Sequence, residues 1–93
     1  MQIYTDDQNL ILRLKIVDNN NSSITGILYN NVLLSVSYLL ETGTSFVTPT
    51  LVDGTLGTYI SNSWKEIGGG LYQYCPPNEA IVSKSITIIK IIY

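Results

Sequence analysis

Histidine is absent from this chain of 93 residues, and cysteine, methionine, tryptophan and phenylalanine each occur once. Without histidine, the side chain best suited to proton transfer near neutral pH is missing, and Ser/His/Asp and Cys/His nucleophile systems are excluded within this chain. The single Cys75 excludes an internal disulfide and every zinc pattern that needs several cysteines, and it is compatible with a reducing compartment. We therefore expect a protein that is not an enzyme and has no metal or cofactor.

Charge is also scarce. Charged residues make up 13% of the chain, and five basic against seven acidic residues give a formal net charge of −2. No basic field exists to attract a phosphate backbone, so no nucleic-acid partner is expected. The longest apolar run, residues 86–93, is interrupted by Lys90 and is too short to span a bilayer, so no membrane partner is expected either. The first residues lack the basic and apolar regions of a signal peptide, which predicts synthesis in a cytoplasm.

What the chain does have is apolar residues, 45% of the total, which is typical of a globular protein. A chain of 93 residues is long enough for one core and too short for two, so a single domain over residues 1–93 is predicted. The rest of its surface is mostly Ser, Thr, Asn, Tyr and aliphatic groups. Such a surface tends to associate.

Apolar side chains recur at every second position in several short segments, which is the period of a β-strand. In residues 10–17 the even positions are aliphatic while Arg13 and Lys15 fall between them, so the even side should face the core. Pro49 cannot donate a ladder hydrogen bond, so the strand around it should lie at an edge or be broken there. Further strands are predicted at residues 2–5, 32–40, 46–52, 58–60 and 85–93, and residues 24–28 are predicted as a brief strand or a bulge.

Residues 64–77 predict a β-hairpin, because two alternating runs flank Gly68, Gly69 and Gly70 and the second run ends at Pro76-Pro77. Residues 80–84 are predicted as a connector with one helical turn. No segment shows a sustained period of 3.6 residues. About seven or eight short antiparallel strands separated by turn signals predict an all-β fold, specifically an immunoglobulin-like β-sandwich that lacks the cysteine pair of antibody domains.

Candidate chemical sites are few. The loop that starts at Asp18 has calcium-loop residues at its first and third positions but lacks the glycine at the sixth and the glutamate at the twelfth, so an ordinary loop is favoured. The three glycines are not followed by the lysine and hydroxyl residue of a phosphate loop. Nothing in the sequence brings Glu66 and Glu79 together as a glycosidase pair. No catalytic, cofactor-binding or metal-binding residue is predicted.

Aromatic rings raise the question of sugar stacking, since the chain has seven tyrosines and Trp64. Tyr72 and Tyr74 share one face of a strand, and core packing with their hydroxyls bonded to loop backbone is favoured for this pair. Tyr29, Tyr59 and Trp64 stay open between core packing and glycan contact. Tyr59 and Trp64 are the candidate glycan contacts if the protein binds sugar.

The last predicted strand is apolar on both sides, except at Lys90. A two-layer sandwich covers only one face of such a strand, and each fully buried Ile contributes about 1.5–3 kcal/mol. Either a loop covers the second face or a partner does. If a partner docks there, we expect Ile89, Ile91 and Tyr93 to form the interface.

The order of several motifs resembles a small β-sandwich module found in structural proteins of tailed bacteriophages. The matching motifs are Val17-Asp18, Thr25-Gly26, residues 66–72 (Glu-Ile-Gly-Gly-Gly-Leu-Tyr) and Pro76, followed by the aliphatic last strand. Residues 61–63 depart from the pattern, because they lack the glycines that precede the hairpin in the family. The resemblance covers the chain from about Leu10 onward, and its motifs are structural ones.

The resemblance implies a virion protein with an immunoglobulin-like fold. A chain of one domain favours a capsid decoration (auxiliary or cement) protein that binds the capsid shell and stabilises it. Its partners would be the major capsid protein, other virion subunits or further copies of itself, and its location would be the capsid surface. A tail-fibre or baseplate accessory and a carbohydrate-binding host-adhesion module are the alternatives.

Overall fold

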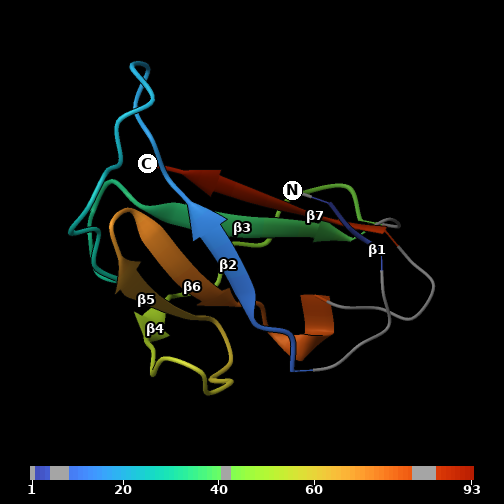
Figure 1. The fold of residues 1–93 in the computed structure, drawn as a ribbon. Helices are drawn as coiled ribbons and strands as arrows, with labels where there is room; N and C mark the ends of the chain where they lie inside the picture. Colours follow the sequence, from blue (N-terminus) through green and yellow to red (C-terminus); the bar gives the residue numbers. More distant parts are fainter. Residues whose placement is uncertain (1, 5–8, 41–42, 81–85) are drawn as a thin grey trace.

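The computed structural model describes residues 2–4, 9–40, 43–80 and 86–93, and almost all of its regular structure is β (Figure 1). One 3₁₀ turn, η1 (Asn78–Ala80), is the only helical element within these ranges. The all-β prediction is therefore confirmed. The strands are β1 (Gln2–Tyr4), β2 (Leu12–Lys15), β3 (Ser35–Leu40), β4 (Val52–Asp53), β5 (Ser63–Gly68), β6 (Leu71–Cys75) and β7 (Ile86–Ile92).

The strands form two sheets, as a β-sandwich requires. The first sheet has the order β1-β7-β3 and the second the order β2-β6-β5-β4. All pairs are antiparallel except β4 with β5, which run parallel, so the prediction of a wholly antiparallel sandwich is wrong at that edge. A constant-type immunoglobulin sandwich, with its strands counted in chain order, places the third, sixth and seventh in one sheet. Here β6 lies in the opposite sheet from β3 and β7.

Strand β2 follows its sequence pattern. Leu12 and Leu14 are half-buried against the core, while Arg13 and Lys15 are exposed. The predicted hairpin is also confirmed: β5 and β6 pair antiparallel and are joined through Gly69 and Gly70. All three hairpin glycines have positive φ, at 138°, 60° and 84° in chain order, which residues with a Cβ rarely adopt.

Strand β3 begins later than its pattern predicts. The alternation reads back to Val32, yet β3 starts at Ser35 and the Val32 side chain is 96% exposed. Asn31 is the cause, because its side-chain oxygen accepts a hydrogen bond from the Leu33 N–H at 2.9 Å and its carbonyl accepts one from the Leu34 N–H at 3.1 Å. These bonds hold a turn and compete with a ladder.

The segment around Pro49 is broken, as predicted. Val47 exchanges two backbone hydrogen bonds with Tyr38 of β3, at 2.9 and 2.8 Å, but no regular strand forms within residues 43–51. The predicted strands at residues 24–28 and 58–60 are also absent from the structure as regular strands. Thr5, Ser85 and the connector at residues 81–84 lie outside the described residues.

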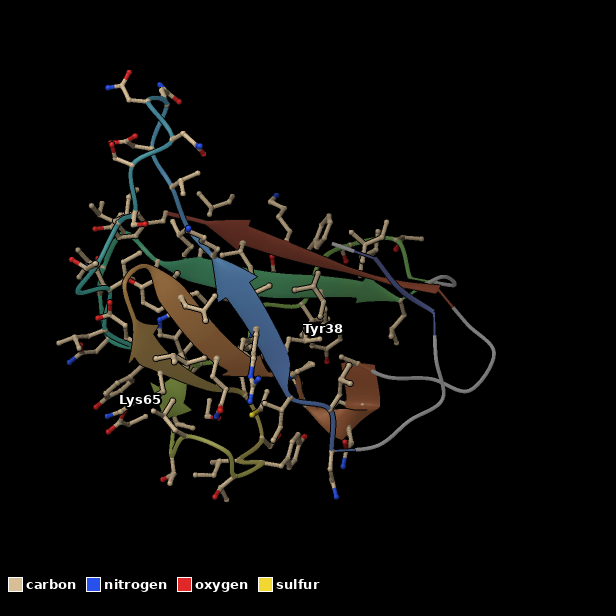
Figure 2. The ribbon with its side chains drawn as sticks, viewed as in Figure 1. Tyr38 and Lys65 are labelled. Atoms are coloured by element: carbon tan, nitrogen blue, oxygen red, sulfur yellow. The ribbon has the colours of Figure 1, made fainter. Side chains whose placement is uncertain are left out.

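One hydrophobic cluster joins the two sheets. Trp64 stacks on Tyr72 with ring centroids 5.2 Å apart, and the ring centroids of Trp64 and Tyr74 are 6.3 Å apart. The first sheet contributes side chains that face these rings, and Figure 2 shows Tyr38 reaching from β3 into the space between the sheets. The fully buried members of the cluster are Ile27, Val36, Trp64, Tyr72, Tyr74, Ala80 and Ile89.

Candidate functional site

No group of three or more metal-ligating side chains gathers anywhere in the part of the chain that the structure describes. The only ion pair within those residues joins Lys65 Nζ to Asp53 Oδ1 at 3.5 Å, and both side chains are solvent-exposed. Such a pair contributes at most about 1 kcal/mol to stability. The exposed features that remain are apolar side chains, which are suited to contacts with other molecules.

Trp64, a candidate glycan contact, is a core residue. Its side chain is 1% exposed, and its indole N–H donates to the Ile27 carbonyl at 3.1 Å. The suggestion that this ring stacks on sugar is therefore wrong, because both ring faces are packed. Tyr59, the other candidate, is half-buried, and its hydroxyl donates to the Pro76 carbonyl at 2.8 Å.

Tyr72 and Tyr74 are both buried in the core, as predicted, but only Tyr72 makes the predicted hydrogen bonds to loop backbone. Tyr72 lies beneath residues 24–27, where its hydroxyl donates to the Ile24 carbonyl at 2.9 Å and accepts from the Ile27 N–H at 3.2 Å. The Tyr74 hydroxyl donates instead to the side chain of Asn62, at 2.9 Å. Burial is the main cause that raises the pKa of both hydroxyls above its usual value, and it does the same for Tyr38.

The three residues predicted as a partner interface do not form one exposed surface. Ile89 is 1% exposed and belongs to the core, so it is not available to a partner and that prediction is wrong for it. Ile91 is half-buried against the same core, whereas Tyr93 is 48% exposed. Since both faces of the strand are aliphatic, its alternation alone did not show which face lies inside.

The outer face of β7 therefore carries Lys90 and Ile92. Ile92 is 50% exposed. The Lys90 ammonium lies over the ring of Phe46, 4.8 Å from its centroid, and Phe46 is itself 40% exposed. Because Lys90 is engaged in this cation–π contact, Ile92 is the exposed aliphatic side chain at this end of the outer face.

The most exposed apolar residues lie in a loop that the sequence did not single out. In this loop, which we call the apolar loop (residues 28–33), Val32 is 96%, Leu33 64% and Leu28 62% exposed. The Asn31 N–H donates to the Leu28 carbonyl at 3.0 Å, so the loop is held by its own backbone in addition to the Asn31 turn. Asn30-Asn31 within an aliphatic run was the available signal, because asparagine favours turns over strands.

The outer face of the second sheet is covered by a strap, residues 54–58. Gln73 holds it: the amide nitrogen of Gln73 donates to the Thr55 carbonyl at 3.0 Å, and its oxygen accepts from the Gly57 N–H at 2.9 Å. Cys75 lies under the same strap, fully buried, with Sγ 3.8 Å from the Thr58 carbonyl. Such burial is typical of a cysteine that packs as a small apolar side chain.

A cleft opens where the end of β7 passes the edge of β2. Its volume is about 450 Å³, and aliphatic side chains make most of its wall. We call it the seam cleft. Its lining residues are Leu14, Lys15, Ile16, Val17, Ile24, Ile89, Ile91 and Tyr93.

Comparisons with protein-family models, with curated proteins and with solved structures found no match for this chain. Within the described residues, no helix is long and apolar enough to cross a membrane.

Proposed function

We propose that this protein is a non-enzymatic structural protein of a tailed-bacteriophage virion, and that it acts as a capsid decoration protein. In this role it binds the assembled shell at the capsid surface and stabilises it by adding contacts between neighbouring subunits. The major capsid protein is the proposed partner. Support comes from the motif resemblance along most of the chain, from the two-sheet β architecture and from the distribution of exposed apolar groups.

The observation that carries the proposal is the apolar loop. Val32 and Leu33 project from a turn that is already hydrogen-bonded, so little conformational entropy would be lost on docking. Burying an exposed Val or Leu side chain completely contributes about 1.5–3 kcal/mol. No charged residue occurs between Asp18 and Glu41, so this part of the chain suits an apolar protein surface.

We also propose that the sandwich is immunoglobulin-like in the broad sense. Two sheets around a buried tryptophan, with a tyrosine hydroxyl bonded to loop backbone, support this assignment. The placement of β6 in the sheet opposite β3 and β7 is a departure from the constant-type strand order. An experimental structure with the strand pairing solved would test the assignment directly.

The virion role is tested by mass spectrometry of purified particles, with copy number measured against the major capsid protein. A copy number comparable with that of the capsid subunits is expected. A few copies per particle would move the protein to the tail or neck, and its absence from particles would overturn the virion assignment.

The docking surface is tested by the double variant Val32→Ser with Leu33→Asn. It should remain folded and lose attachment to particles that lack the native protein. Leu56→Asn is a matched control, because Leu56 is also exposed, at 48%, but lies on the strap. Full occupancy by the double variant would overturn docking through the apolar loop.

A carbohydrate-binding host-adhesion role is the second candidate, and one hollow favours it. Tyr29 is 36% exposed and lines a depression of about 240 Å³ together with Asp53, Lys65 and Glu66. A ring beside carboxylates and an ammonium group is suited to stacking and hydrogen bonding with a sugar. Glycan-array binding that is lost in Tyr29→Ala would support this role, and a flat array would count against it.

A further inference from the structure

A small pocket lies beside the strap on the outer face of the second sheet. Its volume is about 230 Å³. We call it the strap pocket. Its lining residues are Arg13, Leu56, Gly57, Ile67, Leu71 and Gln73.

The pairing of β2, β6 and β5 sets these side chains on one face. Arg13 lies opposite Gln73 in the ladder of β2 and β6. Their strand neighbours Leu14 and Tyr72 belong to the core, so the side chains of Arg13 and Gln73 point away from it. Ile67 is the extra residue of a bulge in β5 and is 38% exposed. The pocket thus has a cation on its β2 side and an aliphatic side chain on its β5 side.

The strap wall of the pocket is held by hydrogen bonds within the fold. The Thr58 N–H donates to the Thr55 carbonyl at 3.1 Å and closes a turn that carries Leu56 and Gly57. Gly57 has a φ of +77°, which glycine adopts easily. The buried Gln73 side chain bonds to both ends of the same turn. Leu56 is therefore presented on a fixed support, so little conformational entropy would be lost when a ligand covers it.

The charge of the pocket comes from Arg13 alone among its lining residues. Arg13 is exposed, and the ion pair between Lys65 and Asp53, the only one in the described ranges, does not involve it. A guanidinium group binds a carboxylate through two parallel hydrogen bonds, which a lysine ammonium group cannot do. The pocket therefore suits a ligand that brings a carboxylate and an aliphatic group together.

The exposure of the pocket wall favours a protein as the ligand. Leu56 and Ile67 line the pocket, yet they are 48% and 38% exposed. A small molecule confined to the pocket leaves that apolar surface in water. A protein segment that extends past the pocket covers it, and the burial adds to the affinity.

A second copy of this chain suits the pocket less well than another protein does. Val17 and Val52 are exposed, and each precedes an aspartate. The Asp18 carboxylate already accepts two backbone hydrogen bonds from its own loop, and the Asp53 carboxylate pairs with Lys65. Pairing of either aspartate with Arg13 of another copy would therefore compete with interactions inside the fold.

We propose that the strap pocket binds an exposed segment of a protein partner in which a leucine or isoleucine side chain stands beside a carboxylate. The aliphatic side chain contacts Leu56, Ile67 and Leu71, and the carboxylate accepts hydrogen bonds from the Arg13 guanidinium group. The site goes beyond the proposed function, because it lies outside the apolar loop and does not require that the partner be a capsid subunit.

The probe is an acetylated and amidated synthetic peptide with Leu-Glu at its centre and glycine and serine on both sides. Its binding to the full chain is followed by NMR on the backbone amide signals of Leu56, Gly57 and Gln73. Saturable shifts of all three signals are expected, with an affinity that falls as salt is added. Control peptides with Leu-Gln or Ala-Glu at the centre should each bind about tenfold less tightly. Equal binding of the three peptides, or no binding of the Leu-Glu peptide, overturns the proposal.

Arg13→Gln tests the carboxylate contact. The Leu-Glu peptide should bind this variant about tenfold less tightly and no better than the Leu-Gln peptide does. Lys15→Gln is the matched control, because Lys15 is also an exposed cation of β2 but lines the seam cleft and not the strap pocket. An equal loss of affinity in the two variants would indicate general attraction to a basic surface and overturn the site.

Leu56→Asn tests the aliphatic contact and separates this site from the proposed function. It should weaken binding of the Leu-Glu peptide about tenfold while attachment to particles through the apolar loop is retained. Unchanged peptide affinity in the folded variant overturns the strap pocket and leaves the virion role untouched. Self-association of the native protein that Arg13→Gln abolishes would assign the pocket to a second copy of the chain and overturn an external partner.

Discussion

At the scale of single residues, three polar atoms of aromatic side chains fasten loops to the core. The Tyr72 hydroxyl and the Trp64 indole N–H both bond to residue 27, whose side chain is fully buried. The Tyr74 hydroxyl donates to the side-chain oxygen of Asn62, which lies in a turn and has a φ of +59°. These rings serve packing and hydrogen bonding together, which leaves little of them for a ligand.

Tyr72→Phe tests this role. The change removes the bonds to the Ile24 carbonyl and the Ile27 N–H and leaves the latter buried without a partner. We expect the free energy of unfolding to fall by about 2–3 kcal/mol in urea titrations. Tyr29→Phe, at an exposed ring, should change it by less than about 0.5 kcal/mol. Equal effects of the two variants would contradict the role assigned to Tyr72.

The residue types predicted these roles only in part. Tyr72 and Tyr74 were assigned to the core because they share a strand face, and the structure agrees. The sequence left Trp64 open between core packing and glycan contact. Trp64 nevertheless lies directly opposite Tyr74 in the hairpin, on the same face of the sheet. Its partner Ile27 lies 37 positions away in the chain, and no local pattern reveals such a contact.

At the scale of elements, β7 shows where alternation has no information. Isoleucine occupies both odd and even positions of this strand, so either face could be the inner one. Only the packing against β3 and β2 places Ile89 and Ile91 inside. In β2 the two basic residues break this symmetry, so the inner face was predicted correctly. Polar residues on one face carry the information that aliphatic ones do not.

Ile89→Ser and Ile92→Ser measure the two faces of β7. The first change empties a fully buried site and places a hydroxyl there, so a loss of about 3–5 kcal/mol is expected. The second, at a half-exposed position, should cost about 1 kcal/mol or less. Chemical denaturation of both variants gives the comparison. A larger effect at Ile92 would mean that the strand presents its other face to the core.

The glycines of the β5–β6 hairpin are unequal, and Gly70→Ala should show it. A Cβ at Gly70, where φ is +84°, would lie 2.8 Å from the Ser23 Cβ and 3.2 Å from the Ile16 carbonyl oxygen. Strained backbone and overpacking together predict a loss of about 2–5 kcal/mol. Gly69→Ala, with nothing within 4 Å of its Cβ, should lose only about 1–2 kcal/mol. Equal losses, measured by thermal unfolding, would contradict the close contact with Ser23.

At the scale of the whole molecule, the sequence predicted the class of fold and much less of its connectivity. Alternation and turn residues identified five of the strands at nearly their observed places, because these signals are local. The division of strands between sheets, the parallel β4 and the seam cleft depend on contacts between distant segments. The apolar loop was missed because Asn31 ends an alternation that reads as continuous.

The core as a whole should be sensitive to alkaline pH. In the unfolded chain each tyrosine ionises near its usual pKa of about 10, while burial raises the pKa of Tyr38, Tyr72 and Tyr74 in the native state. Above about pH 10 the native state therefore binds more protons, and the free energy of unfolding falls by up to about 1.4 kcal/mol per pH unit for each tyrosine.

Urea titrations between about pH 8 and pH 11 measure this slope. Tyr74→Phe, which cannot ionise at that position, should show a smaller decline over the same interval. A stability that is flat or rises across this range would mean that the three hydroxyls are not held neutral by the fold.

The strap held by Gln73 makes local opening of this protein measurable through Cys75. Because the chain's one sulfhydryl is sealed beneath residues 54–58, its rate of reaction with an aromatic disulfide reagent reports how often that cover lifts. This rate can be measured without attaching a label to the protein. The reaction should be faster in Gln73→Ala, which lacks the two hydrogen bonds to the strap. It should be slower when a partner covers the strap.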